Sequence, residues 1–150
     1  ILKNLNTLHI RMQQHSKNAK FLADKFSEAG VRVIYPGLKN FPQYSRMVEL
    51  MNSDYGFGGM LAIDLETAKK ASNIMQAMQD ADVGYLAVSL GYFRTLFSNS
   101  GRSTSSEIPE EIQRSMGLSE GLVRFSVGLD HDIERTWERI YKCLKDFLMI

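Results

Sequence analysis

The segment LVRFSV, from Leu122 to Val127, carries the clearest strand pattern in the chain. Apolar and polar residues alternate along it, which predicts a β-strand with one face against a core. Three apolar side chains share that face: Val123, Phe125 and Val127. Arg124 and Ser126 point to the opposite face. Apolar residues then recur at helical spacing from Ile133 to Leu148, so an amphipathic helix is predicted after the strand.

The rest of the chain also alternates between helical and strand patterns. Four further helices are predicted: Leu5 to Phe26, Phe41 to Met51, Glu66 to Asp80 and Pro109 to Gly117. Three further strands are predicted: Val31 to Tyr35, Gly59 to Leu65 and Gly84 to Leu90. Gly30 is expected to end the first helix, because glycine takes the left-handed conformation easily. The polar run from Ser98 to Ser106 predicts a loop.

These elements predict an α/β fold of two layers. About four strands form a largely antiparallel sheet, and the helices pack on one face of it, because each helix is apolar on one side only. The pattern does not set the strand order. With 44% hydrophobic and 23% charged residues, the 150-residue chain has the composition of one globular domain.

Charge and cysteine content exclude several classes of function. There are 18 Lys and Arg against 17 Asp and Glu, spread along the chain without a basic stripe, which argues against nucleic acid as a partner. Cys143 is the only cysteine, and no Cys/His spacing indicates a metal site. No apolar run is long enough for a membrane span. We therefore expect a cytoplasmic protein and, because it begins at Ile1 within a helical pattern, a fragment of a longer chain.

Most other notable residues are expected to be structural. His9, His15 and His131 are predicted to lie at the surface, because they are far apart and on helical segments. The glycine-rich run Tyr55 to Gly59 precedes a strand rather than following one, which favours a turn or close backbone packing over a phosphate cradle. Five methionines are expected to fill the core: Met47, Met51, Met60, Met75 and Met78.

Arg124 is the main candidate for chemistry. On a half-buried strand it is either exposed to solvent or directed at an anion, and solvent exposure is the commoner outcome for such residues. Ser89 and the serine-rich loop could complete a polar pocket, but sequence spacing alone does not bring them together.

Several motifs occur in an order found in one enzyme family. They are YPGL at Tyr35 to Leu38, Pro42-Gln43, GFGGML at Gly56 to Leu61, AVSLG at Ala87 to Gly91, SSEIPEE at Ser105 to Glu111 and GLVRFSVGLD at Gly121 to Asp130. Over nearly its whole length the chain resembles the small C-terminal domain of the trans-sulfuration, or Cys/Met metabolism, enzymes, which depend on pyridoxal 5′-phosphate (PLP) and have fold type I.

The resemblance implies roles for four residues. Arg124 matches the arginine that holds the substrate's α-carboxylate, a role that suits the two parallel N–H donors of a guanidinium. Ser89 matches the serine beside the carboxylate and cofactor, and Thr104 matches a threonine in a loop near the active site. Val88 is a further substrate-side position. The loop departs from the family pattern, because Ser105 stands where the family usually has histidine.

The resemblance also implies what this chain lacks. The family's cofactor lysine lies in a Ser-x-Thr-Lys motif that does not occur here, and the cofactor is held by a larger N-terminal domain. Residues 1–30 would then form a long helix leading in from that domain. We therefore expect no catalytic residue and no metal site in this fragment, no activity from it alone, and a homo-oligomeric intact enzyme.

The implied reaction is that of a lyase acting on a small-molecule sulfur amino acid. Val88 is apolar where cystathionine-cleaving members often carry Glu, which favours a methionine γ-lyase type of γ-elimination releasing a thiol, ammonia and a 2-oxoacid. Arg94 stands at a position that is often acidic in the family, so the resemblance does not decide which substrate is used. The alternatives are O-acetylhomoserine sulfhydrylase, cystathionine γ-synthase, cystathionine lyase or, in another class, a free-standing ligand-binding module. A Ser-x-Thr-Lys segment upstream of Ile1 would favour the enzyme.

Overall fold

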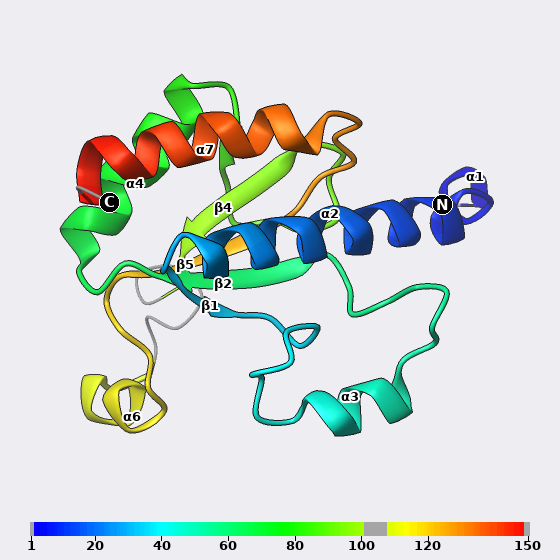
Figure 1. Cartoon of the computed structure of the whole chain (residues 1–150), viewed down its shortest axis with the longest axis horizontal. Coiled ribbons are helices and arrows are strands. Elements are labelled where there is room, and N and C mark those ends of the chain that lie inside the picture. Colours follow the sequence, from blue (N-terminus) through cyan, green and yellow to red (C-terminus); the bar gives the residue numbers. More distant parts are fainter. Residues whose placement is uncertain (1, 101–107, 149–150) are drawn as a thin grey trace.

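The computed structural model describes residues 2–100 and 108–148, which form a five-stranded sheet with helices packed on it (Figure 1). The strands are β1 (Arg32–Ile34), β2 (Met60–Asp64), β3 (Gly84–Leu86), β4 (Thr95–Asn99) and β5 (Leu122–Ser126). Their spatial order is β1-β2-β5-β4-β3, so the predicted strand β5 is central. The pairs β1–β2, β2–β5 and β4–β5 are antiparallel, and only β3–β4 is parallel among the described strands.

The helices are α1 (Leu2–Leu5), α2 (Leu8–Glu28), α3 (Tyr44–Leu50), α4 (Ala68–Asp80), α6 (Glu110–Ser115) and α7 (Ile133–Leu148). Three of them, α2, α4 and α7, form one layer over the sheet (Figure 1). In this layer α2 packs on β1 and β2, α4 packs on β3, β4 and β5, and α7 packs on α2 and α4. The two-layer α/β architecture with a mostly antiparallel sheet is therefore confirmed.

The core forms where these helices meet the middle strands. Phe26 of α2 packs edge-on against both Phe125 of β5 and Trp137 of α7, with ring centroids 5.6 and 5.2 Å apart. Phe97 of β4 also packs against Phe125, with ring centroids 5.8 Å apart. These rings join two helices to the two central strands, and burial of aromatic rings is among the largest contributions to folding free energy.

Two strands differ from the prediction. Thr95–Asn99 forms β4, which was not predicted and whose last residues were expected to begin a loop, so the sheet has five strands where about four were expected. The predicted strand Gly84 to Leu90 ends at Leu86, and the chain leaves the sheet after Ala87, whose amide still donates to the Phe97 carbonyl of β4. All five residues of β4 are buried, so this strand lacks the apolar–polar alternation that marks a half-exposed strand.

The first helix also differs from the prediction. Residues 1–30 were expected to form one long helix, but a turn at Asn6 and Thr7 separates α1 from α2. Only the C-terminal half of α2 packs on the core, because its other end projects past the strands (Figure 1). Leu8 and Ile10 are consequently exposed. Gly30 does follow the helix with φ +77°, as expected.

His15 is not a surface residue. Its side chain is only 4% exposed, and Nδ1 lies 2.6 Å from the carbonyl oxygen of Val127. Asn18, one helical turn later, donates from Nδ2 to the carbonyls of Gly128 and Asp130. These two side chains of α2 satisfy the backbone where β5 ends, so the buried histidine has a structural role.

The methionine and glycine predictions have mixed outcomes. Met75 and Met78 are buried, but Met60 is 36% exposed and Met47 and Met51 are only half-buried. The glycine-rich run packs closely on α2, as expected: a Cβ at Gly56 would lie 2.6 Å from Ser16 Oγ, which also accepts a hydrogen bond from the Gly58 amide.

Cys143 is free and buried on α7, and its burial raises the pKa of the thiol. Within residues 2–100 and 108–148, no helix has the length and apolar character needed to cross a membrane. The same residues contain no cluster of three His, Cys, Asp or Glu side chains arranged to hold a metal ion.

Glycine is required where the chain leaves β5. A Cβ at Gly128 would lie 2.5 Å from the Phe93 carbonyl oxygen and 2.6 Å from the Thr95 nitrogen, both of which are backbone atoms. We predict that Gly128→Ala lowers the free energy of unfolding by about 3 kcal/mol, because the backbones must separate. Gly117→Ala is the control, since a Cβ there meets nothing within 4 Å, and its positive φ predicts a loss of about 1 kcal/mol. Equal losses in urea denaturation would contradict the prediction.

Candidate functional site

The candidate site lies on the sheet face opposite the helices. Val123 and Phe125 are fully buried on the helix side, so the predicted alternation of β5 is confirmed and Arg124 points to the other face. There Arg124 is paired with Ala62 of β2 on one side and Ser98 of β4 on the other. Arg124 therefore projects from the middle of the sheet, held between two strands.

The segment Ala87–Arg94 crosses this face and is attached to β5 by two hydrogen bonds. Arg124 donates from Nη2 to the Ser89 carbonyl oxygen at 3.0 Å. The Gly91 amide donates to Ser126 Oγ, also at 3.0 Å. Both polar side chains on the open face of β5 therefore hold the same segment.

The guanidinium of Arg124 retains donors for a ligand. Its Nε is sealed from solvent, although the residue as a whole is half-buried. Among the described residues, the hydrogen bond to Ser89 is the only one its side chain makes. Because a guanidinium has five N–H donors, the Nη end can still offer a pair of them to a planar anion such as a carboxylate.

The structure brings two of the other predicted site residues close to Arg124. Ser89 meets the arginine through its backbone carbonyl, while the residue itself is exposed. Val88 is adjacent in the crossing segment and 63% exposed. Thr104 and Ser105 lie outside the described residues.

Arg94, at the end of the crossing segment, belongs to a different arrangement. It donates to the backbone and carboxylate oxygens of Asp82 and lies over the ring of Tyr85, 5.0 Å from its centroid. The hydrogen bond to Asp82 raises the pKa of Arg94. The geometry makes Arg94 a clamp on the turn before β3.

Ser98 was considered only as the first residue of the serine-rich loop that could complete a polar pocket, and the sequence did not single it out. Its side chain lies next to Arg124 on the open face and is 5% exposed, and its Oγ has no hydrogen-bond partner among the described residues. The signal was available in part, because Leu96 and Phe97 precede Ser98 and are typical of a strand. The pairing with Arg124 depends on the strand register.

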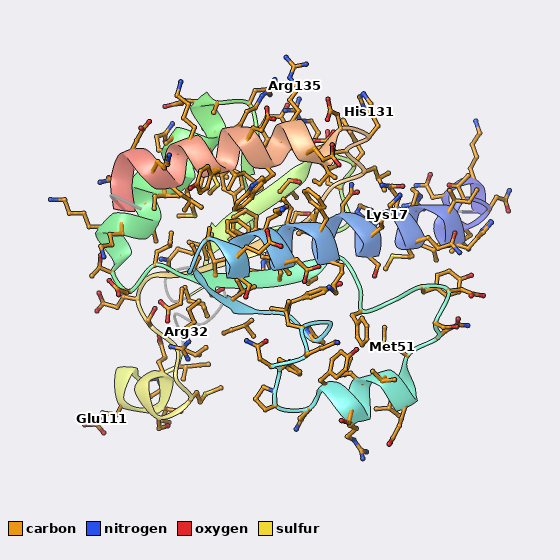
Figure 2. All side chains as sticks on the ribbon, in the orientation of Figure 1. Lys17, Arg32, Met51, Glu111, His131 and Arg135 are labelled. Atoms are coloured by element: carbon orange, nitrogen blue, oxygen red, sulfur yellow. The ribbon has the colours of Figure 1, made fainter. Side chains whose placement is uncertain are left out.

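A charged cleft of about 390 Å³ lies elsewhere, between the start of β4 and the start of α7. His131 and Arg135, labelled in Figure 2, line it together with Arg94, Arg139 and Asp82. Arg94 and Arg139 both contact the Asp82 carboxylate, so much of the positive charge is already paired. Neither Arg124 nor Ser89 lines this cleft, which is therefore separate from the candidate site.

Comparison with known proteins identifies close relatives. Residues 1–136 match the family model described as "Cys/Met metabolism PLP-dependent enzyme". The chain is 45% identical over 136 residues to a methionine gamma-lyase of Arabidopsis thaliana, an alignment covering 90% of this chain and 31% of that protein. It is 36% identical over 148 residues to an L-methionine gamma-lyase of Pseudomonas putida, covering 97% of this chain and 35% of that protein.

The fold has a counterpart among solved structures. The crystal structure of cystathionine gamma-lyase from yeast superposes with a TM-score of 0.86 at 31% sequence identity. The match covers 97% of this chain and 37% of the yeast enzyme. The chain thus spans about a third of the length of the proteins that it matches.

Proposed function

Because the chain belongs to the Cys/Met metabolism PLP-dependent enzyme family, we propose that it forms the substrate-facing C-terminal part of a carbon–sulfur lyase. In this proposal the intact enzyme is a homo-oligomer that acts on a sulfur amino acid. The observation that carries the proposal is the half-buried Arg124, which is fixed to the Ser89 carbonyl and still has N–H donors at its Nη end.

Arg124 binds the α-carboxylate of the amino acid in this mechanism. Two parallel N–H donors fix both the position and the plane of the carboxylate, and the positive charge balances its negative charge. The hydrogen bond to Ser89 limits rotation of the guanidinium before the substrate arrives. The arginine therefore orients the substrate for the reaction.

The cofactor itself requires residues beyond this chain. When bound, PLP supplies an electron sink for cleavage of the carbon–sulfur bond. No lysine among the 150 residues stands in a Ser-x-Thr-Lys sequence, so we assign the cofactor lysine to the rest of the enzyme. Among the described residues, Arg124 and its neighbours suit the carboxylate of the substrate rather than the cofactor.

We propose methionine as the preferred substrate, cleaved by γ-elimination to a thiol, ammonia and a 2-oxoacid. The exposed Val88 supports this preference, because an apolar side chain beside Ser89 suits a methyl thioether better than a substrate with a second charged group. The 45% identity to the Arabidopsis protein supports it as well. Cystathionine and the homoserine esters are the competing substrates.

The carboxylate role predicts the effect of Arg124→Lys in the full-length enzyme that contains this chain. We expect kcat/KM to fall about tenfold to a hundredfold, because lysine keeps the charge but loses the paired donors. The melting temperature should change little. Arg32→Lys is the matched control, since Arg32 lies on the same sheet and pairs with Asp64 at its edge. Kinetics of Arg124→Lys equal to those of the control would refute the role.

Substrate preference can be tested directly with the full-length enzyme. We predict that methionine gives methanethiol and 2-oxobutyrate with a higher kcat/KM than cystathionine or than O-acetylhomoserine with sulfide. The measurement is 2-oxoacid and thiol release in parallel assays, with product analysis for replacement reactions. Higher kcat/KM with either competitor would reject the methionine assignment and leave the lyase family unaffected.

The assignment of the cofactor lysine elsewhere also gives a prediction for the 150-residue chain alone. Incubation with PLP followed by borohydride reduction should give no specific adduct at low cofactor concentration, because the required lysine motif is absent. Intact-mass measurement and peptide mapping would detect any adduct. The full-length enzyme, treated in parallel, should gain one cofactor at one lysine. A single modified lysine within this chain would contradict the prediction.

A further inference from the structure

Two buried polar atoms lie on neighbouring residues of the candidate site. Arg124 Nε and Ser98 Oγ are both inaccessible to solvent and have no hydrogen-bond partner among residues 2–100 and 108–148. They are the only two buried side-chain nitrogen or oxygen atoms in that part of the chain with this property. Buried polar groups without partners are uncommon in native proteins, because each one costs desolvation free energy.

The strand register places the two side chains together. Ser98 of β4 and Arg124 of β5 are directly paired in the antiparallel ladder, so both point to the open face. Side chains paired in this way have Cβ atoms about 5 Å apart. The residue paired with Arg124 from the other strand is Ala62, which has no polar side-chain atom. Ser98 is therefore the cross-strand neighbour whose side chain can accept a hydrogen bond from Arg124.

The two atoms are chemically complementary. Arg124 Nε carries one N–H donor, and the serine hydroxyl is both an acceptor and a donor that turns about its Cα–Cβ bond without moving the backbone. A hydrogen bond between them would satisfy both. It would also hold the guanidinium at a second point, because Nη2 is already bonded to the Ser89 carbonyl.

We propose that Ser98 is a positioning residue for Arg124, whose Nε–H it accepts, and that it thereby fixes the plane in which the Nη donors meet the substrate's carboxylate. This inference rests on the proposed function of Arg124. With Nε tied to β4 and Nη2 tied to the crossing segment, the guanidinium can no longer rotate about its last side-chain bonds. The loss of Ser98 should weaken carboxylate binding and leave the chemical step nearly unchanged.

The test uses the full-length, cofactor-loaded enzyme and compares Ser98→Ala, Ser98→Thr and Ser16→Ala. Ser16 is an equally buried serine with a bonded hydroxyl, but it lies on α2, on the helix side of the sheet. The readouts are KM and kcat for methionine, the Kd of L-alanine, which has the carboxylate but no sulfur leaving group, and the melting temperature.

For Ser98→Ala we expect KM and the alanine Kd to rise about threefold to tenfold, the range produced by losing one hydrogen bond, with kcat within about twofold. Ser98→Thr should restore both values, because it keeps the hydroxyl. Ser16→Ala should lower the melting temperature and leave KM and the alanine Kd unchanged. A crystal structure should join Ser98 Oγ to Arg124 Nε, directly or through one water molecule.

Three results would overturn the inference. If Ser98→Ala binds alanine and methionine as the wild type does, while Arg124→Lys weakens both, the proposed function stands and the role of Ser98 is wrong. The same holds if Ser98→Ala lowers kcat and melting temperature together and threonine does not rescue it, because this pattern indicates packing. If Arg124→Lys itself leaves alanine binding unchanged, the proposed function fails and the role of Ser98 fails with it.

Discussion

The alternation of side chains along β5 governs both the packing of the core and the layout of the candidate site. This strand is central in the sheet, and its residues belong alternately to the core and to the candidate site. A slip of one residue in its pairing would move Arg124 among the apolar side chains of the helix layer and expose Val123 and Phe125. Stability of the core and orientation of the arginine are therefore determined by the same register.

Both ends of β5 are fixed by backbone contacts that allow no slip. Gly121 lies so close to the chain at Glu66 and Thr67 that a Cβ there would come within 2.5 Å of their nitrogens, and Gly128 lies equally close to the segment before β4. Between them, His15 contacts the carbonyl of Val127 from α2. The two glycines and His15 therefore hold the ends of β5 in place, and this fixes the register of the strand that carries Arg124.

The sequence predicted the elements whose apolar residues recur with a regular period. Strand β5 and helices α4 and α7 follow from apolar periodicity, and the two-layer architecture follows from their one-sided character. Strand β4 could not be predicted in the same way, because its two apolar residues, Leu96 and Phe97, are adjacent and its last residues are polar, so no alternation is present. His15 was misjudged because its partner lies 112 residues away, and no local pattern encodes such a contact.

The candidate site divides along the same line. The alternation along β5 was enough to predict that Arg124 points away from the core. Its association with Ser89 came only from the family resemblance. The contact uses the backbone carbonyl of Ser89, which every residue type has, so the sequence does not reveal it. That carbonyl contact has an evolutionary consequence. Substitutions at position 89 can alter the surface offered to a ligand without disturbing the hold on Arg124. The two properties can thus diverge independently, so related chains can change what they recognise beside the arginine while its orientation is inherited intact.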